Sequence, residues 1–143
     1  MRAFALCSLF VFAMPAVADD KSDAEFKALV GKWDIVKSEL GGMDVTEHLK
    51  AMKFEIMAGG KYVAEIGNEK DEGAFTMDLG KTPKEMDVKS TGGPNKDKVI
   101  KAIYKLDGDT MVVCYELGGG DRPAKFESKE KSMQLLTAYK RKK

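Results

Sequence analysis

Apolar and polar residues alternate along most of the chain between residues 32 and 141. Trp33 and Ile35 alternate with charged residues, and Phe54 and Ile56 do the same. Because successive side chains of a β-strand point to opposite faces, this period of two predicts strands with one buried face and one solvated face. The pattern predicts eight strands, at residues 32–40, 52–56, 61–67, 73–80, within 81–90, 99–106, 111–117 and 132–141.

Turn sequences separate these segments. "AGG" at 58–60, "NEKDE" at 68–72 and "DGDT" at 107–110 are expected to form hairpin turns, while 91–98 and 118–131 are longer polar connectors. Short strands with turns about every 8–12 residues are typical of an up-and-down barrel or a sandwich. Closing eight strands into a cylinder removes the exposed edges of the sheet. We therefore predict an all-β fold, an antiparallel up-and-down barrel of about eight strands.

A short helix is expected before the first strand. Ser22 and Glu25 have the spacing of a capping box, which would start the helix at Ser22. Gly31 suits the position that ends it. Apolar residues of this segment fall on one face, as in a helix that packs on a core: Phe26, Leu29 and Val30. The linker "GGMDVTEHLK" at 41–50 predicts one further helical turn, capped by Asp44 or Thr46.

The first eighteen residues have the pattern of a secretory signal peptide. Arg2 precedes an apolar run at 3–14, and "AVA" at 16–18 has the small residues of a cleavage site. The run is shorter than the roughly 20 residues that a membrane-spanning helix needs. We expect an exported protein, secreted or periplasmic, whose mature chain is a single domain at 19–143 with no integral membrane segment.

The charge balance argues against nucleic-acid binding. The chain has 24 basic and 23 acidic residues, and one basic residue is Arg2, so residues 19–143 carry no net formal charge. A neutral chain has no overall field to attract a polyanion. Cys114 is the one cysteine after residue 18, so no internal disulfide is expected, and its apolar neighbours predict a buried thiol.

No catalytic or metal-binding constellation emerges. His48 is the one histidine, and no nucleophile or carboxylate is placed to form a triad with it, so we expect an exposed or lid-packed side chain and no enzyme. One histidine and one mature cysteine cannot supply a zinc site. Asp107 and Asp109 lack the later ligands of a calcium loop and are expected to form a hairpin turn. The sequence predicts no metal and no cofactor.

The inward faces of the strands leave two readings open. An eight-stranded barrel is just wide enough to be filled by side chains or to hold one small ligand. In the first case the loops would meet a protein partner; in the second a small apolar molecule would bind inside, with 41–50 as a lid over the open end. The interior set is Trp33 together with the candidate ligand-binding residues Ile35, Phe54, Ile56, Phe75, Met77, Met86 and Tyr104.

Arg122 is a further candidate. Pro123 holds it in an extended conformation, from which the guanidinium would pair with Asp87 or Asp121 or would bind an anionic ligand. Both alternatives remain open from the sequence.

The start of the first strand carries a family resemblance. Gly31 and Trp33, which follow a short expected helix and are separated by a single residue, resemble the glycine–x–tryptophan motif of the lipocalins. The resemblance implies that Trp33 packs across the closed end of a barrel and that Arg141, at the end of the last strand, covers its ring. A guanidinium over an indole contributes about 0.5–2 kcal/mol.

Most of the chain also resembles a narrower group, the uncharacterised secreted lipocalin-like domains abundant in planctomycete bacteria. The matching stretches are "GKWDIVKSELGG", "KTPKEMDV", "AIYKLDGDTMVVC", "GGGDRPAKFES" and "YKR". The resemblance implies an exported lipocalin-like barrel without an established activity. "FKALVGKWDIVKSE" also resembles the start of intracellular fatty-acid-binding proteins, but the signal peptide and the number of strands count against that group. We expect a binder of a small hydrophobic or amphipathic molecule, or a ligand-free interaction module.

Overall fold

A computed structural model of the chain describes residues 17–143; residues 1–16, most of the predicted signal peptide, lie outside the described part. The elements follow the predicted order along the chain, with few additions. They are α1 (Val17–Leu29), β1 (Gly31–Leu40), β2 (Met43–Asp44), α2 (Thr46–Leu49), β3 (Lys53–Met57), β4 (Lys61–Ile66), β5 (Glu69–Asp78), β6 (Lys84–Gly92), β7 (Val99–Asp107), β8 (Thr110–Glu116) and β9 (Gln134–Arg141).

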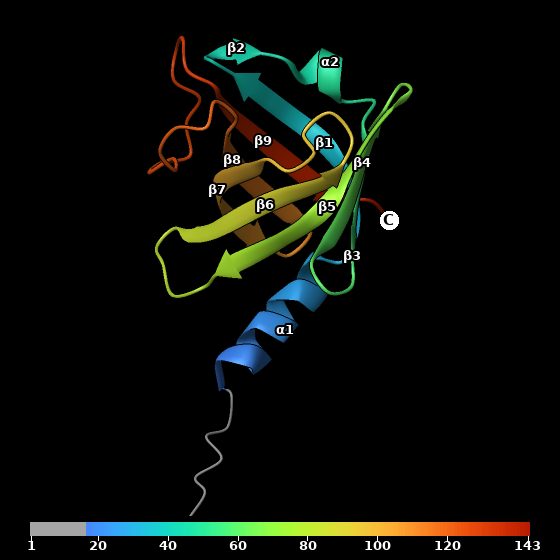
Figure 1. The fold of residues 1–143 in the computed structure, drawn as a ribbon, viewed down its shortest axis with the longest axis vertical. Helices are drawn as coiled ribbons and strands as arrows, with labels where there is room; N and C mark the ends of the chain where they lie inside the picture. The colour runs from blue at the N-terminus through green and yellow to red at the C-terminus, as the bar shows by residue number, and fades with distance from the viewer. Residues whose placement is uncertain (1–16) are drawn as a thin grey trace, which may run out of the picture.

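The strands form a closed antiparallel barrel, as the alternation predicts (Figure 1). From β3 to β9 each strand pairs with the next one along the chain, and β1 pairs with both β3 and β9, which closes the cylinder with eight strands. The β1–β9 seam runs from Trp33 opposite Arg141 to Leu40 opposite Leu135, with a bulge between Ile35 and Lys37. The two-residue β2 only extends the end of β1. Most connections between neighbouring strands of the barrel are therefore short loops, and the two long ones are at 41–52 and 117–133.

The inward side chains form the core. They are almost entirely apolar, and the largest buried ones include Trp33, Tyr104 and Met111. Two buried hydroxyls, of Ser38 and Thr137, lie 2.8 Å apart and bond each other across the β1–β9 seam. Buried polar groups in the seam are therefore hydrogen-bonded and do not weaken it.

Helix α1 closes one end of the barrel and extends beyond it (Figure 1). Leu29 is fully buried, and the Phe26 ring lies 5.5 Å from the Phe75 ring inside the barrel. Below them, the Glu25 carboxylate accepts hydrogen bonds from Lys84 and Tyr104, each at 3.0 Å. Side chains from the last turns of the helix thus cover the lower end of the interior.

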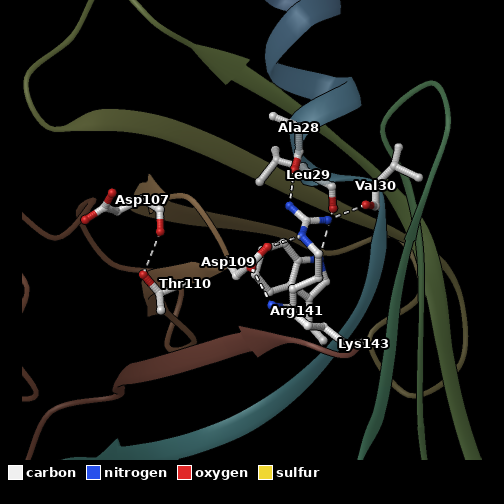
Figure 2. Close-up of polar contacts among 9 residues, drawn as sticks. Ala28, Leu29, Val30, Asp107, Asp109, Thr110, Arg141 and Lys143 are labelled. Atoms are coloured by element: carbon white, nitrogen blue, oxygen red, sulfur yellow. Dashed lines mark hydrogen bonds and ion pairs between the residues drawn. The ribbon is translucent and has the colours of Figure 1, made fainter.

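The predicted Trp33–Arg141 pair lies at this closed end. The guanidinium carbon of Arg141 is 4.4 Å from the centre of the Trp33 ring. Arg141 donates to the carbonyl oxygens of Ala28 and Val30, and the Trp33 indole donates to the carbonyl oxygen of Leu29 at 2.9 Å (Figure 2). The last carbonyls of a helix have no partner within it. Here the two side chains satisfy three successive carbonyls and thereby fix α1 against the barrel.

Gly31 makes the turn between α1 and β1 possible. Its φ of 146° is rarely adopted by residues with a side chain, and a Cβ there would lie 2.9 Å from Nη1 of Arg141. The glycine of the motif is therefore required both by the backbone and by the close approach of the guanidinium.

Three details of the sequence prediction are wrong. Helix α1 begins at Val17, so Ser22 lies inside the helix and does not cap it. "NEKDE" is not a turn: only Gly67 and Asn68 connect β4 to β5, and β5 begins at Glu69. The helical turn predicted at 41–50 is present as α2, but β2 precedes it, and its N-cap position is held by Val45 without a side-chain cap rather than by Asp44 or Thr46.

Candidate functional site

A cavity of about 230 Å³ occupies the upper half of the barrel interior, at the end opposite α1. It lies where β4 ends, β5 begins and β8 and β9 meet, and Met52 and Asn95 reach it from the connectors. Its walls are mostly apolar. Five aromatic side chains contribute to them: Phe54, Tyr62, Phe75, Tyr115 and Tyr139.

Four of the predicted ligand-binding residues line this cavity. Phe54 and Ile56 reach it from β3, Phe75 from β5 and Met86 from β6. Their inward orientation follows from the alternation along each strand, which is why the sequence identified them.

Three other predicted residues do not line the cavity, although they are at least partly buried. Ile35 belongs to the packed core, while Met77 and Tyr104 lie lower in the barrel. The Tyr104 hydroxyl is 3.0 Å from the carboxylate of Glu25 and 3.1 Å from the sulfur of Met77. Burial, together with the charge of Glu25, raises the pKa of Tyr104 far above its ordinary value. The entry of α1 into the base separates these residues from the cavity, and no pattern in the strands themselves predicts this.

Arg122 lies outside the barrel, so its predicted place in the barrel interior is wrong. It donates to the carbonyl oxygens of Met86 and Ala102, both at 2.9 Å, and to the carboxylate of Asp87 at 2.6 Å. A second carboxylate, of Glu85, lies 3.4 Å from Nε. The predicted pairing with Asp87 is confirmed. Arg122 therefore fastens the connector 117–133 to the outer face of β6 and β7.

The sequence analysis missed the polar groups of the cavity. The hydroxyls of Tyr115 and Tyr139 lie 2.9 Å apart, and burial raises the pKa of Tyr115 well above its usual range and that of Tyr139 to about 12. Asp71, which lies near the start of β5, also lines the cavity. It was overlooked because the charged stretch "NEKDE" is typical of a turn. If the alternation of the following strand is extended backward into this stretch, Asp71 falls on the same face as Phe75.

Residues considered for catalysis lie away from the cavity. His48 is exposed on α2 and does not contribute to the cavity wall. Cys114 is buried under the connector and donates to the carbonyl oxygen of Glu127 at 3.3 Å, and burial raises the pKa of its thiol. Asp107 and Asp109 flank the predicted β7–β8 hairpin turn. Across residues 17–143 no group of three or more histidine, cysteine or acidic side chains is arranged to hold a metal ion.

The lid segment predicted at 41–50 lies at the open end of the barrel, where β2 and α2 adjoin the end of β1 (Figure 1). Leu49 and Met52 pack against the core, and Met52 also lines the cavity. None of the helices in the described part of the chain has the length and apolar character needed to cross a bilayer.

A scan of protein-family models, a search of curated proteins and a search of solved structures each find no match to this chain. The function is therefore inferred from the residues of the cavity.

Proposed function

We propose that the protein is an exported, lipocalin-like binding protein that takes up a small hydrophobic or amphipathic molecule in the barrel cavity and has no catalytic activity. The observation that carries this proposal is the cavity of about 230 Å³ with mostly apolar walls. Ligand sites are typically concave, apolar and furnished with a few polar groups. An engineered apolar cavity of about 150 Å³ is already large enough for benzene.

The lipocalin-like assignment is supported by the closed eight-stranded barrel and by the stacking of Arg141 on Trp33 after Gly31. Export is supported by the sequence pattern of residues 1–18.

The proposal is tested by native mass spectrometry of the purified protein and by calorimetric titration with 2-phenylethanol, a neutral aromatic probe. We expect saturable one-to-one binding with a negative heat-capacity change, which is the signature of apolar surface buried on binding. Ala64→Phe would fill the cavity from β4 and abolish binding. Glu65→Phe, which adds the same ring to the exposed face of that strand, is the matched control and should bind as the wild type does.

A second candidate function is a ligand-free module that binds another protein through the open end. Three apolar side chains there are exposed: Met43 (68%), Met133 (50%) and Leu117 (37%). The same experiments distinguish the two functions. No saturable binding of the neutral probe or of a charged probe of the same shape, together with no added mass in the native spectrum, would contradict the binder and favour the interaction module.

A further inference from the structure

One wall of the cavity contains a carboxylate oxygen without a hydrogen-bond partner. Oδ1 of Asp71 exposes less than 1 Å² and accepts no hydrogen bond within the described part of the chain. Its other oxygen, Oδ2, is 3.5 Å from the Tyr62 hydroxyl, which is longer than a normal O–H···O bond. A buried charged oxygen without a donor is unfavourable, and such groups in native proteins call for an explanation.

No group in the described part of the chain donates to this oxygen. The Tyr62 hydroxyl, which also shares a hydrogen bond with Ser90 at 2.9 Å, faces the other oxygen, Oδ2. The adjacent Lys70 is exposed and pairs with Glu72 on the outer face of β5, and none of the ion pairs among the described residues includes Asp71. A molecule in the cavity can therefore supply a donor to this oxygen without displacing any contact within the protein.

The surroundings of Asp71 define the chemistry of that molecule. Asp71 is the one acidic or basic residue, tyrosines aside, among the residues that line the cavity, all of which lie in the described part. Aromatic rings are clustered in the same wall: Phe54 is 6.4 Å from Tyr62 and 5.2 Å from Tyr139, measured between ring centres. Aromatic rings attract cations, and a carboxylate in an apolar cavity favours a charged donor over a neutral one.

We propose that the cavity binds a small organic cation, with an ammonium group that donates a hydrogen bond to Asp71 and an aromatic or compact aliphatic body that fills the apolar part. This rests on the proposed binding function and adds the class of ligand to it. The volume of about 230 Å³ suits a single ring with a short side chain. Anionic amphiphiles, which include fatty acids, are excluded by repulsion from the same carboxylate.

The test compares three probes of one shape by calorimetric titration at neutral pH: 2-phenylethylamine, which is a cation, 2-phenylethanol, which is neutral, and 3-phenylpropionate, which is an anion. For the wild type we expect the amine to bind at least tenfold more tightly than the alcohol, and the anion not to bind. In Asp71→Asn the amine and the alcohol should bind within threefold of each other. Glu72→Gln removes a neighbouring exposed carboxylate and should keep the full preference.

The outcomes separate this inference from the function on which it rests. If the alcohol binds to the wild type as tightly as the amine does, the preference for a cationic ligand is refuted, while the proposed binding function stands. If neither probe binds, both fail. Equal loss of preference in Asp71→Asn and Glu72→Gln would refute the role of Asp71. Asp71→Asn should also unfold at the same or a higher urea concentration than the wild type. A strong destabilisation would instead show that Asp71 stabilises the fold. In either case the comparison of probes on the wild type decides the class of ligand.

Discussion

Replacing Arg141 by lysine tests the closed end of the barrel most directly. The guanidinium stacks on Trp33 and donates to two helix carbonyls, of Ala28 and Val30. Lysine keeps the charge and can reach one of these carbonyls, but it loses the second bond and the planar stack. The perturbation therefore removes the geometry of the contact and leaves the net charge unchanged.

The expected cost of Arg141→Lys follows from the two lost interactions. A hydrogen bond from a charged donor contributes about 1.5–3 kcal/mol, and a partly exposed cation–π contact contributes about 0.5–1 kcal/mol. The Arg141 side chain is 23% exposed, so the lower values apply, and the free energy of unfolding should fall by about 2 kcal/mol. For a domain of this size that corresponds to a Tm lower by roughly 6–10 °C.

The assay is urea unfolding followed by the fluorescence of Trp33, the one tryptophan of the chain, and by circular dichroism in parallel. Asp109→Asn is the matched control, because it removes only exposed ion pairs: those of the 47% exposed Asp109 side chain with Nε of Arg141 at 3.2 Å and with Nζ of Lys143 at 3.6 Å. Such a pair contributes less than about 1 kcal/mol. A cost for Arg141→Lys no larger than that of Asp109→Asn would refute the reasoning that the guanidinium fixes α1 to the barrel.

Three further changes have expected outcomes. The pKa of Tyr139 is raised from 10.0 to about 12, so between these pH values the folded chain keeps a proton that the unfolded chain loses. The free energy of unfolding should therefore be constant below about pH 10 and fall by on the order of 2–3 kcal/mol as the pH rises toward 12. Urea titrations of Tyr139→Phe should show a smaller fall. Gly73→Ala would place a Cβ 2.1 Å from the carbonyl oxygen of Lys89, so thermal unfolding should show a loss of about 2–3 kcal/mol, and an unchanged Tm would contradict the close approach of β5 and β6. Arg122→Lys should lose about 2 kcal/mol of stability through its contacts with Asp87 and two carbonyls, without altering probe affinity in calorimetry, since a change in affinity would place Arg122 in the site.

The barrel was predictable because its strands have a period of two that apolar residues make visible. In "VIKAIYKL" every second side chain points inward, and the structure places Ile100, Ala102 and Tyr104 in the core as expected, although Ile103 between them is buried too. The closed end was predictable for a different reason: the resemblance of Gly31 and Trp33 to a known motif named Arg141 as the partner, across more than a hundred residues of chain.

The cavity was only partly predictable, because its limits depend on contacts between distant segments. The size of the cavity depends on how much of the barrel base is occupied by side chains of α1. Phe26 and Leu29 occupy the space below Phe75. The position of Arg122 depends on the connector 117–133, which crosses the outer face of β6 to β8. A proline after Arg122 restricts its backbone, but it cannot determine on which side of a sheet the side chain lies.

Asp71 shows where local patterns fail and why the failure is informative. Its stretch is continuously charged, so binary patterning assigns it to a turn, and only tertiary pairing with β4 and β6 turns the side chain inward. The other interior hydroxyl pairs, such as Tyr115 with Tyr139, are mutually satisfied. A fold under selection for stability alone has no reason to retain one unpartnered carboxylate oxygen in an apolar wall, because an apolar residue there would be more favourable. Violations of this kind concentrate at functional sites. The sequence position at which the prediction of the fold failed is therefore the position that carries the proposal of a cationic ligand.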